Sequence, residues 1–382
     1  MKKIAVIGCT GSIGTQALDV IRHRRSDFRV AALSCHKNTD LLLKQVEEFT
    51  PQVVGISDEA AYKAVKDELI AKGIRVLGGQ EAHSGCIETS DCDTTLISVV
   101  GFSGLSPLVS SIRLKKQTCV ANKESIVCGG SAIVELCKQH GVELLPVDSE
   151  HNAIYQCLMG NEGQQIRKIH LTCSGGPFLH WAKEDIAKAT WQQALKHPKW
   201  NMGRKISIDS ATLANKGLEV LEAKWLFHVP LEKINVVVHP QSIVHSMVEY
   251  ADGSILSQMG PTDMRIAIQF ALTYPKRESC IMPPLDLFTM GELTFLPPDV
   301  TRFPCLALAM EAAKAGGITP IAFNAANDVA VEAYLKGAIP FYDIPKLIES
   351  AYQRFHGGEE PVLSDIPRMD AAVREYISKS IS

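Results

Sequence analysis

Short apolar runs alternate with helical patterns over the first 148 residues of the chain. The runs that predict strands include Ile4–Ile7, Val30–Leu33, Val53–Ile56, Thr95–Val100, Thr118–Ala121 and Glu143–Val147. Between them lie stretches with apolar residues at helical spacing, such as Thr15–Arg22 and Ala60–Lys72. Strands and helices in alternation are typical of a parallel sheet that helices cover on both faces. We therefore expect a doubly wound α/β domain over residues 1–148.

The pattern changes between residues 149 and 274, where a mixed sheet is expected. The predicted strands are Ile166–Thr172, Lys205–Ile208, Ile234–Val238, Ile243–Tyr250 and Ser254–Met259. The last two are joined by Asp252-Gly253, and Asp-Gly between apolar runs is a strong signal for a β-hairpin. A long amphipathic helix is predicted at about Leu213–Phe227. This region predicts an α+β domain with helices on one face of its sheet.

Proline punctuates the chain from residue 275 to residue 303, which predicts a long connection between domains. Four helical patterns follow it, at Leu306–Ala315, Ile321–Leu335, Ile344–Phe355 and Met369–Ser378. Short amphipathic helices in succession favour a small C-terminal helical bundle over residues 304–382.

Composition and charge narrow the function classes. Hydrophobic residues make up 46% and charged residues 21% of the chain, as in soluble globular proteins. The net charge of -3 gives no basic field for nucleic acid or an anionic membrane. No apolar run approaches the roughly 20 residues of a membrane span, and the first residues enter a strand pattern without the features of a signal peptide. The 11 cysteines are scattered, without a Cys-x-x-Cys pair, which fits a reducing compartment. We expect a cytoplasmic protein.

A glycine-rich loop joins the first predicted strand to the first predicted helix. It reads Gly8-Cys9-Thr10-Gly11-Ser12-Ile13-Gly14. Small residues let the backbone turn tightly and approach a pyrophosphate, whose charge is met by N–H groups at the helix N-terminus. The strand-loop-helix context favours a Rossmann-like dinucleotide site over a tight turn without a ligand.

The end of the second predicted strand bears on the choice of cofactor. An NAD-preferring site should place an acid there, about 20 residues after the glycine loop. This chain has Ser34-Cys35-His36-Lys37-Asn38 instead. A cation with small polar groups suits the 2′-phosphate of NADP, although Lys37 could also be a solvated loop lysine.

Acidic residues follow the strand that ends near Val147. Asp148 and Glu150 are two apart, so at a strand end they can point the same way. Two hard carboxylates on one side suit Mg²⁺ or Mn²⁺. Equally, Asp148 or Ser149 could merely cap the helix that follows. Glu219 and Glu222 lie three apart on one helix face and could add a carboxylate, although most such pairs are solvated surface charges.

Small and basic loops could hold a phosphate group. Ser174-Gly175-Gly176-Pro177-Phe178 follows a strand, and Asp209-Ser210-Ala211-Thr212 follows another and leads into the helix that carries Asn215-Lys216. Hydroxyl, amide and ammonium groups are those that a phosphate ester needs. The segment from His197 to Arg204 contains Trp200 and Gly203 and could close over a substrate as a lid. Each of these segments could instead be an ordinary surface turn.

In this order the motifs resemble those of the 1-deoxy-D-xylulose 5-phosphate reductoisomerase family. Further segments that carry the resemblance are Ala121-Asn122-Lys123-Glu124-Ser125, Pro146-Val147-Asp148-Ser149-Glu150-His151, His197-Pro198-Lys199-Trp200-Asn201-Met202-Gly203, Asn215-Lys216-Gly217-Leu218-Glu219, His239-Pro240-Gln241-Ser242 and Asn324-Ala325-Ala326-Asn327. The match runs from the first strand to the last helices. One departure is His36, where the family often has a glycine before the Lys-Asn pair.

The resemblance implies a role for each matching position. The residues that would bind NADPH are Thr10, Gly11, Ser12, Ile13, Lys37, Asn38, Asn122, Glu124 and Gly203. The metal ligands would be Asp148, Glu150 and Glu219, holding Mg²⁺, Mn²⁺ or Co²⁺, with Glu222 left as a surface acid. The residues that would bind the substrate phosphate are Ser174, Ser210, Asn215 and Lys216, with His197 nearby. Lys123 and Ser149 would contact the hydroxyl and carbonyl region, together with the metal ligands Glu150 and Glu219, and Trp200 would cover the substrate.

The family's reaction rearranges and reduces 1-deoxy-D-xylulose 5-phosphate to 2-C-methyl-D-erythritol 4-phosphate, in non-mevalonate isoprenoid precursor biosynthesis. The resemblance also implies a homodimer. A rival is an NADP oxidoreductase like the semialdehyde dehydrogenases, which needs a catalytic Cys beside a His. No cysteine here lies in a recognisable nucleophile loop. A second rival is a non-catalytic NADP-sensing protein, which would have no use for three carboxylates and a phosphate site together.

The cofactor assignment predicts the effect of replacing Lys37 with Asp. Loss of one charge-assisted contact to a phosphate should weaken NADPH binding roughly tenfold to a hundredfold. NADH lacks the 2′-phosphate, so its affinity should change far less. Dissociation constants of the two cofactors, measured by fluorescence titration, check this. Equal losses for both would show that Lys37 does not read the 2′-phosphate.

Overall fold

The computed structural model describes residues 1–381, and they form two compact units. Unit 1 comprises residues 1–125, 133–152 and 263–283, and unit 2 comprises residues 126–132, 153–262 and the chain from 284 on. The chain therefore passes repeatedly between the units. The units do not coincide with the four consecutive segments expected from the sequence, which were 1–148, 149–274, 275–303 and 304–382. One reason is that residues 263–283 carry a helix that packs in unit 1.

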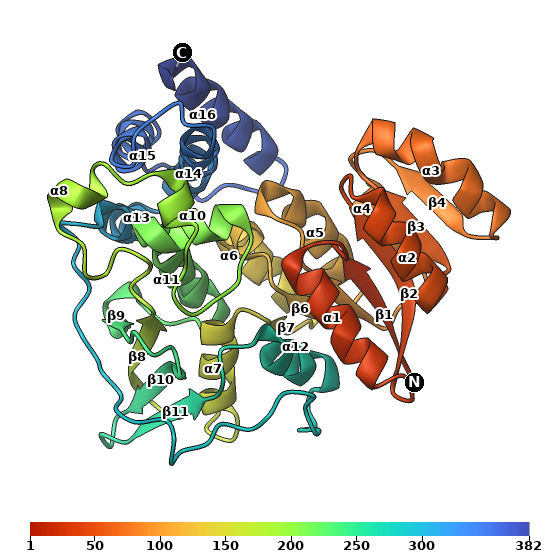
Figure 1. Cartoon of the computed structure of the whole chain (residues 1–382), viewed down its shortest axis with the longest axis horizontal. Coiled ribbons are helices and arrows are strands. Elements are labelled where there is room, and N and C mark those ends of the chain that lie inside the picture. The colour runs from red at the N-terminus through yellow and green to blue at the C-terminus, as the bar shows by residue number, and fades with distance from the viewer. Residues whose placement is uncertain (382) are drawn as a thin grey trace. The chain divides into compact units, whose positions relative to one another are not determined.

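Unit 1 is built on a parallel sheet, which confirms the expected α/β class (Figure 1). Its strands are β1 (Lys2–Ile7), β2 (Phe28–Cys35), β3 (Val53–Ile56), β4 (Arg75–Gly78), β5 (Thr94–Ile97), β6 (Gln117–Val120) and β7 (Leu144–Pro146). In the sheet they lie in the order β4-β3-β2-β1-β5-β6-β7. Strand β4 was not predicted, because its four residues are only half-buried or exposed and have no apolar run.

Helices connect these strands and cover the sheet. They are α1 (Ser12–His23), α2 (Thr39–Phe49), α3 (Glu59–Ala71), α4 (Ala82–Thr89), α5 (Leu105–Arg113) and α6 (Lys123–His140), with α12 (Met264–Thr273) added from later in the chain. Helix α7 (Ser149–Leu158) follows β7, and its residues from 153 on belong to unit 2. Helix α1 packs against α12, and α4 packs against α5. Because parallel crossovers are right-handed, the reversal of strand order at β1 places α1 and α4 on opposite faces. Ligands bind at such a reversal in open α/β sheets.

Unit 2 contains the expected mixed sheet. Its strands are β8 (Ile166–Cys173), β9 (Ile234–Val238), β10 (Val244–Tyr250) and β11 (Ile255–Met259), in the order β11-β10-β8-β9. Strand β8 runs parallel to β9 and antiparallel to β10. The predicted hairpin is present between β10 and β11. Its turn places Gly253 at φ +87°, and the Asp252 carboxylate accepts the Ser254 N–H at 2.9 Å.

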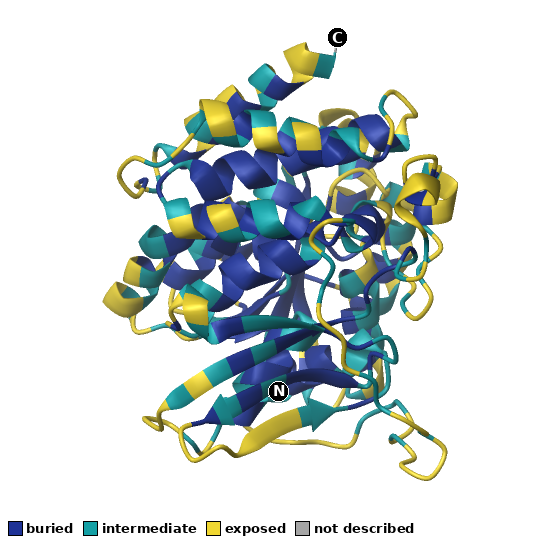
Figure 2. Ribbon diagram, turned by 90° about the vertical axis from the view of Figure 1, so that its left-hand side faces the viewer, coloured by how far each residue is buried: buried dark blue, intermediate teal, exposed yellow. Residues whose placement is uncertain are grey.

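The helices of unit 2 share one apolar core with the loop after β8. They are α8 (Lys183–Ile186), α9 (Trp191–Ala194), α10 (Arg204–Thr212), α11 (Ala214–Leu226), α13 (Pro304–Ala315), α14 (Thr319–Leu335), α15 (Asp343–Arg354) and α16 (Ile366–Ile381). The core includes Ile208, Leu218, Leu306, Phe323 and Ile377. The predicted C-terminal helices are therefore confirmed, and they bury their apolar faces together with α10 and α11. Figure 2 shows the buried residues of the chain in dark blue.

The strand expected at Lys205–Ile208 is wrong, because these residues lie in helix α10. Four residues of alternating polarity do not distinguish a strand from a helix. Over a longer window Ser207, Ile208, Ala211 and Thr212 are buried, which is the spacing of one helix face. Of the helices within residues 1–381, none combines the length and the apolar character needed to cross a membrane.

Candidate functional site

The glycine loop lies at the point in unit 1 where the strand order reverses. A Cβ on Gly8, whose φ is +93°, would lie 2.8 Å from the backbone of Ser98, and one on Gly14 would lie 2.2 Å from the Gly8 carbonyl oxygen. Glycine is therefore required at both positions by the close packing of β1, α1 and the loop after β5. Helix α1 starts at Ser12 after the exposed Gly11, with no side-chain cap and no acid in its first turn. Its first N–H groups can therefore receive an anion.

Two buried residues, Ser34 and His83, support this loop. The Ser34 carbonyl oxygen accepts the N–H groups of Gly8 and Cys9, at 3.0 and 2.8 Å. The Ser34 hydroxyl lies 2.9 Å from Nδ1 of His83 on α4. Burial lowers the pKa of His83 to about 4, so the ring is neutral at physiological pH. His83 has no sequence signal, because only the sheet topology brings α4 beside the loop.

The end of β2 presents the residues expected at the adenosine side. His36, Lys37 and Asn38 are all exposed. The Asn38 side chain accepts the N–H of Leu41 at 3.3 Å and so caps α2. Nδ1 of His36 lies 3.0 Å from the Ser57 hydroxyl. Within the described part of the chain, no carboxylate forms an ion pair with Lys37, and none follows β2 directly.

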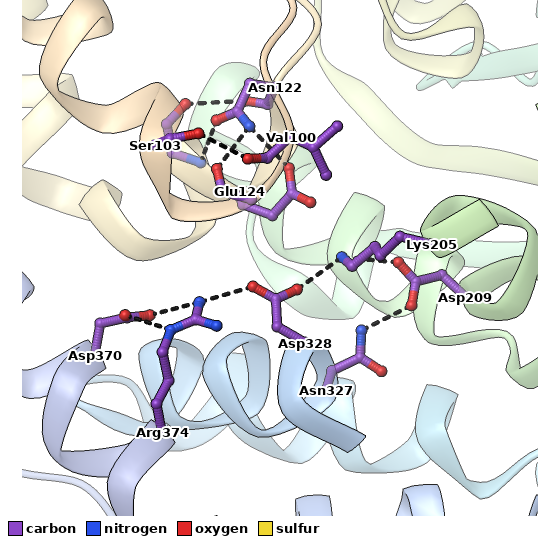
Figure 3. A network of polar contacts seen from close by, with 12 residues as sticks. Val100, Ser103, Asn122, Glu124, Lys205, Asp209, Asn327, Asp328, Asp370 and Arg374 are labelled. Atoms are coloured by element: carbon purple, nitrogen blue, oxygen red, sulfur yellow. Dashed lines mark hydrogen bonds and ion pairs between the residues drawn. The ribbon is translucent and has the colours of Figure 1, made fainter. Parts of the chain in front are cut away.

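Asn122 holds together the turns that follow β5 and β6. It is 2% exposed, its Oδ1 accepts the N–H of Ser125 at 2.9 Å, and its Nδ2 donates to the carbonyl oxygens of Val99 and Gly101, both at 2.9 Å. Nδ2 also lies 3.0 Å from the Glu124 carboxylate (Figure 3). The side chain is thus engaged within the protein. A cofactor contact of Asn122 stays a prediction, and it would have to come from the backbone.

Asp148 and Glu150 of unit 1 do not lie at a strand end, where the sequence pattern predicted them. Strand β7 ends at Pro146 and α7 begins at Ser149, so Glu150 lies in the first helical turn while Asp148 precedes it. The two residues therefore do not alternate along a strand, but their carboxylates do converge as predicted, with a ligand oxygen of each within 4.8 Å of the other. Ser149 donates a hydrogen bond to the Glu150 carboxylate at 2.6 Å.

Asp148 forms an ion pair with Lys123 at the start of α6. Nζ of Lys123 lies 2.6 Å from Oδ2 of Asp148, and the two side chains are 7% and 13% exposed. Nδ1 of His151, which is completely buried, lies 3.9 Å from the same oxygen. Unit 1 thus brings Lys123 and Asp148 together at the carboxyl ends of β6 and β7. No role was predicted for His151.

In unit 2 the residues after β8 meet the predicted lid. Ser174 Oγ lies 2.8 Å from Nε2 of His197 and accepts the N–H of Gly176 at 3.1 Å. Nδ1 of His197 accepts the N–H groups of Lys199 and Trp200, at 3.2 and 2.9 Å. A ring nitrogen that accepts carries no proton, so Nε2 carries it and donates to Ser174. The Ser174 hydroxyl proton can then be donated to an anion.

Ser210 lies beside this loop. A Cβ on Gly176, whose φ is +73°, would lie 2.6 Å from the Ser210 carbonyl oxygen, so glycine permits the close approach of the loop to α10. Ser210 itself is in α10 and does not follow a strand, which corrects the expected placement of Asp209-Ser210-Ala211-Thr212. The error follows from the wrong strand at Lys205–Ile208.

Helix α11 carries the polar residues Asn215, Lys216 and Glu219 together. Nδ2 of Asn215 lies 2.5 Å from Oε1 of Glu219, and Lys216 forms an ion pair with Oε2 of the same carboxylate. Lys216 is 2% and Glu219 0% exposed. Glu222 is only 1% exposed, so its expected place on the surface is wrong. The reason is that α11 is packed from several sides, including α10 and α13, whereas the sequence pattern suggested one solvated face.

The lid segment runs from His197 to Gly203, the residue before α10. The Trp200 ring is partly buried, with its centroid 6.1 Å from that of His245. A Cβ on Gly203 would meet no atom within 4 Å, so packing within the chain does not require glycine there. Each unit therefore gathers its own set of predicted residues, and the union of both sets in one site stays a prediction.

Known proteins resemble this chain along its whole length. Three family models match the chain. The model described as 1-deoxy-D-xylulose 5-phosphate reductoisomerase matches residues 4–130. Those described as 1-deoxy-D-xylulose 5-phosphate reductoisomerase C-terminal domain and DXP reductoisomerase C-terminal domain match residues 144–227 and 259–376. Proteins named 1-deoxy-D-xylulose 5-phosphate reductoisomerase from Agathobacter rectalis and Clostridium perfringens strain 13 are 48% and 47% identical over 379 residues. The alignments cover 99% of this chain, and 100% and 99% of those proteins.

Solved structures agree with this similarity. A crystal structure of DOX-P reductoisomerase in complex with NADPH, fosmidomycin and magnesium is 38% identical, with a TM-score of 0.94 over 100% of this chain and 98% of that one. The reductoisomerase from Zymomonas mobilis in complex with NADPH is 39% identical, with a TM-score of 0.91 over 100% and 99% of the two chains.

Proposed function

Because the chain belongs to the 1-deoxy-D-xylulose 5-phosphate reductoisomerase family, it converts that substrate to 2-C-methyl-D-erythritol 4-phosphate with NADPH and a divalent metal ion, and we propose which side chains do so. The reaction belongs to non-mevalonate isoprenoid precursor biosynthesis. The match of all three family models along the chain is the observation that carries the function. Oxidation of NADPH with 1-deoxy-D-xylulose 5-phosphate, with and without Mg²⁺, tests it directly.

We propose that Asp148, Glu150 and Glu219 hold the metal ion. The donors fit, since all three are hard carboxylates of the kind that Mg²⁺ and Mn²⁺ prefer. Asp148 forms an ion pair with Lys123, and Glu219 forms one with Lys216. Each carboxylate therefore already stabilises a positive charge next to it. A divalent ion held there supplies polarisation of the substrate's oxygens and stabilises the negative charge that develops on them.

The glycine loop and the turns beside it would hold NADPH. Thr10, Gly11, Ser12 and Ile13 surround the start of α1, where N–H groups meet the pyrophosphate. Exposed Lys37 and Asn38 would contact the adenosine end, and Asn122, Glu124 and Gly203 would also touch NADPH. The fit rests on the uncapped N-terminus of α1, the absence of an acid after β2, and the glycines that let the backbone approach.

Hydroxyl, amide and ammonium groups of unit 2 would bind the substrate phosphate. Ser174 accepts hydrogen bonds from His197 and Gly176, so its own proton is directed to an anion. Ser210, Asn215 and Lys216 complete the proposed set, and Trp200 would cover the substrate and exclude water. Lys123 and Ser149 would orient the hydroxyl and carbonyl groups of the substrate. Lys123, as an ammonium beside Asp148, can stabilise oxygen charge or supply a proton during rearrangement.

The cysteines argue against the semialdehyde dehydrogenase alternative. None of the 11 forms a disulfide within the described residues, and each is buried or half-buried. Burial raises the pKa of Cys35, Cys119 and Cys305 to about 12, so these thiols do not ionise at neutral pH. Thiolate nucleophiles need lowered pKa values and access to substrate. Free thiols throughout also support the proposal that the protein works in the reducing cytoplasm.

The metal proposal predicts the effect of Glu219→Gln. The amide keeps the shape of the side chain but removes one anionic ligand, so turnover should fall at least about a hundredfold. NADPH binding should remain, because the glycine loop lies in the other unit and needs no cation. Glu332→Gln is a matched control, since Glu332 is exposed on α14. Near-normal turnover in Glu219→Gln, or an equal loss in the control, would refute the assignment. Chelation should have the same effect as Glu219→Gln.

The phosphate proposal predicts how the dephosphorylated sugar behaves. Binding energy at Ser174, Ser210, Asn215 and Lys216 should be used to position the reacting carbons. The sugar without phosphate should therefore lose turnover at saturation as well as affinity. Steady-state kinetics with both sugars measures this. If the dephosphorylated sugar reacts as fast at saturation, the four residues do not serve the reaction.

We propose that two copies of the chain form a homodimer through the edge strand β11. Ile255 and Leu256 are 53% and 41% exposed, and an open strand edge with apolar side chains favours pairing with another chain. Leu256→Lys should shift sedimentation from dimer toward monomer at micromolar concentration. Val362→Lys is the control, since Val362 is 59% exposed away from this strand. An unchanged dimer in Leu256→Lys would place the interface elsewhere.

A further inference from the structure

A chain of buried ion pairs connects the C-terminal helix to the helix that follows the lid. Arg374 on α16 binds Asp370 at 2.6 Å and Asp328 at 2.7 Å. Asp328 on α14 lies 3.1 Å from Nζ of Lys205, which binds Asp209 at 2.8 Å. Lys205 and Asp209 are both on α10, as Figure 3 shows. The chain thus spans three helices within unit 2.

The carboxylates of this network are too buried to be ordinary surface charges, whereas its cations Lys205 and Arg374 are half-buried, with 20% and 31% of the side chain exposed. The carboxylates of Asp209, Asp370 and Asp328 are 2%, 7% and 13% exposed. Nδ2 of Asn327 also donates to Asp209 at 2.8 Å. Burial opposes the charge of Asp328, but Lys205 and Arg374 hold its pKa below the ordinary value. Burial raises the pKa of Asp209. Charges this far from water are held in a fixed geometry by their partners.

The position of α10 matters for the proposed site. The helix begins directly after Gly203, whose carbonyl oxygen accepts the N–H and hydroxyl of Ser207, at 3.1 and 2.9 Å. Its last turn carries Ser210, one residue after Asp209. Apolar contacts of Ile208 and Ala211 hold α10 in the core, but they are not directional. The ion pairs that Lys205 and Asp209 form are directional, so they set the rotation of the helix about its axis.

We propose that Asp328 and Arg374 are positioning residues, which tether the lid and the phosphate-binding Ser210 to the C-terminal helix through Lys205. The effect of these two residues on substrate binding rests on the proposed function, whereas their effect on the lid does not. A fixed α10 keeps the end of the lid and the Ser210 hydroxyl in one place before substrate arrives. Substrate binding then has less conformational freedom to remove.

Asp328→Asn is the substitution that cuts the tether with least damage. Three carboxylates and two cations take part, so the charged network has one excess negative charge. After Asp328→Asn, Lys205 retains Asp209 and Arg374 retains Asp370, and each pair is neutral. The substitution therefore leaves no buried charge unpaired. An unpaired buried charge is what makes a deletion in such a network severely destabilising. Asp365→Asn is the control, because Asp365 makes an exposed 3.9 Å pair with Arg368 just before α16.

Two measurements on the full-length enzyme test the tether. Trypsin can cleave the lid region after the exposed Lys199 and Arg204, and mass spectrometry follows each cut. Cleavage there should be roughly threefold to thirtyfold faster in Asp328→Asn, the range by which network residues modulate coupling. The KM for the sugar phosphate should rise by a similar factor, with a smaller change in kcat. Cleavage after the exposed Lys63 on α3, in unit 1, serves as the internal reference.

The outcomes separate positioning from simple stabilisation. A lower melting temperature with unchanged lid cleavage and unchanged KM would overturn the proposal, as would equal effects in Asp365→Asn. Faster lid cleavage with an unchanged KM would overturn it as well. If the wild-type enzyme does not turn over the sugar phosphate, the proposed function fails, and the cleavage rates alone then decide whether the tether exists.

Discussion

Charged side chains removed from water must be paired, and helix α11 carries several of them through the middle of unit 2. Lys216 and Glu219 are almost completely buried and bind each other. Removing one member of such a pair costs about 3–5 kcal/mol, because the other charge is left unpaired. A fold would not retain this arrangement for stability alone, since well-packed apolar residues serve as well. The surrounding helices and the loop after β8 are therefore organised around a polar center that has to be satisfied.

Unit 1 meets a different constraint, which is steric. The glycine loop is compressed between β1, α1 and the loop after β5, so that Gly8 and Gly14 leave no room for a side chain. The same compression brings the N-terminus of α1 to the carboxyl ends of the strands, where Ser34 and neutral His83 hold the loop by hydrogen bonds. An anion site made of backbone N–H groups needs such rigid support, because it has no side chain of its own to adjust.

The reductoisomerase reaction joins two demands, hydride transfer and rearrangement of a phosphorylated sugar, and the chain provides for them with separate elements. Parallel strands and their loops supply the groups proposed to bind the cofactor and the two carboxylates near β7 that are proposed to hold the metal. Helices α10 and α11, with the loop after β8, supply the groups proposed to bind phosphate. The ionic network from Arg374 to Lys205 adds a third component, because it makes the position of α10 depend on the last helix of the chain.

Much of the fold followed from periodicity alone. Elements with long apolar patterns, such as β1, β8 and α14, are determined by residues that are close together in the sequence. The same holds for the glycine loop and the Asp252-Gly253 turn. The segment at Lys205–Ile208 was misread because four alternating residues suit either a strand or a helix, and only packing against the core selects the helix. Glu222 was misplaced because other helices, including α10 and α13, pack against α11, and the local sequence pattern does not show this packing.

Sequence by itself determined the family, the cofactor class and the candidate residues, since these depend on residue types in a particular order. Only the tertiary structure decided which groups pair with each other. It joined Lys123 to Asp148, His197 to Ser174 and Arg374 to Lys205 through Asp328. Such pairings involve residues far apart in the chain, and no local pattern encodes them. They arise because burial of the apolar faces brings polar groups together, and those groups must then satisfy one another.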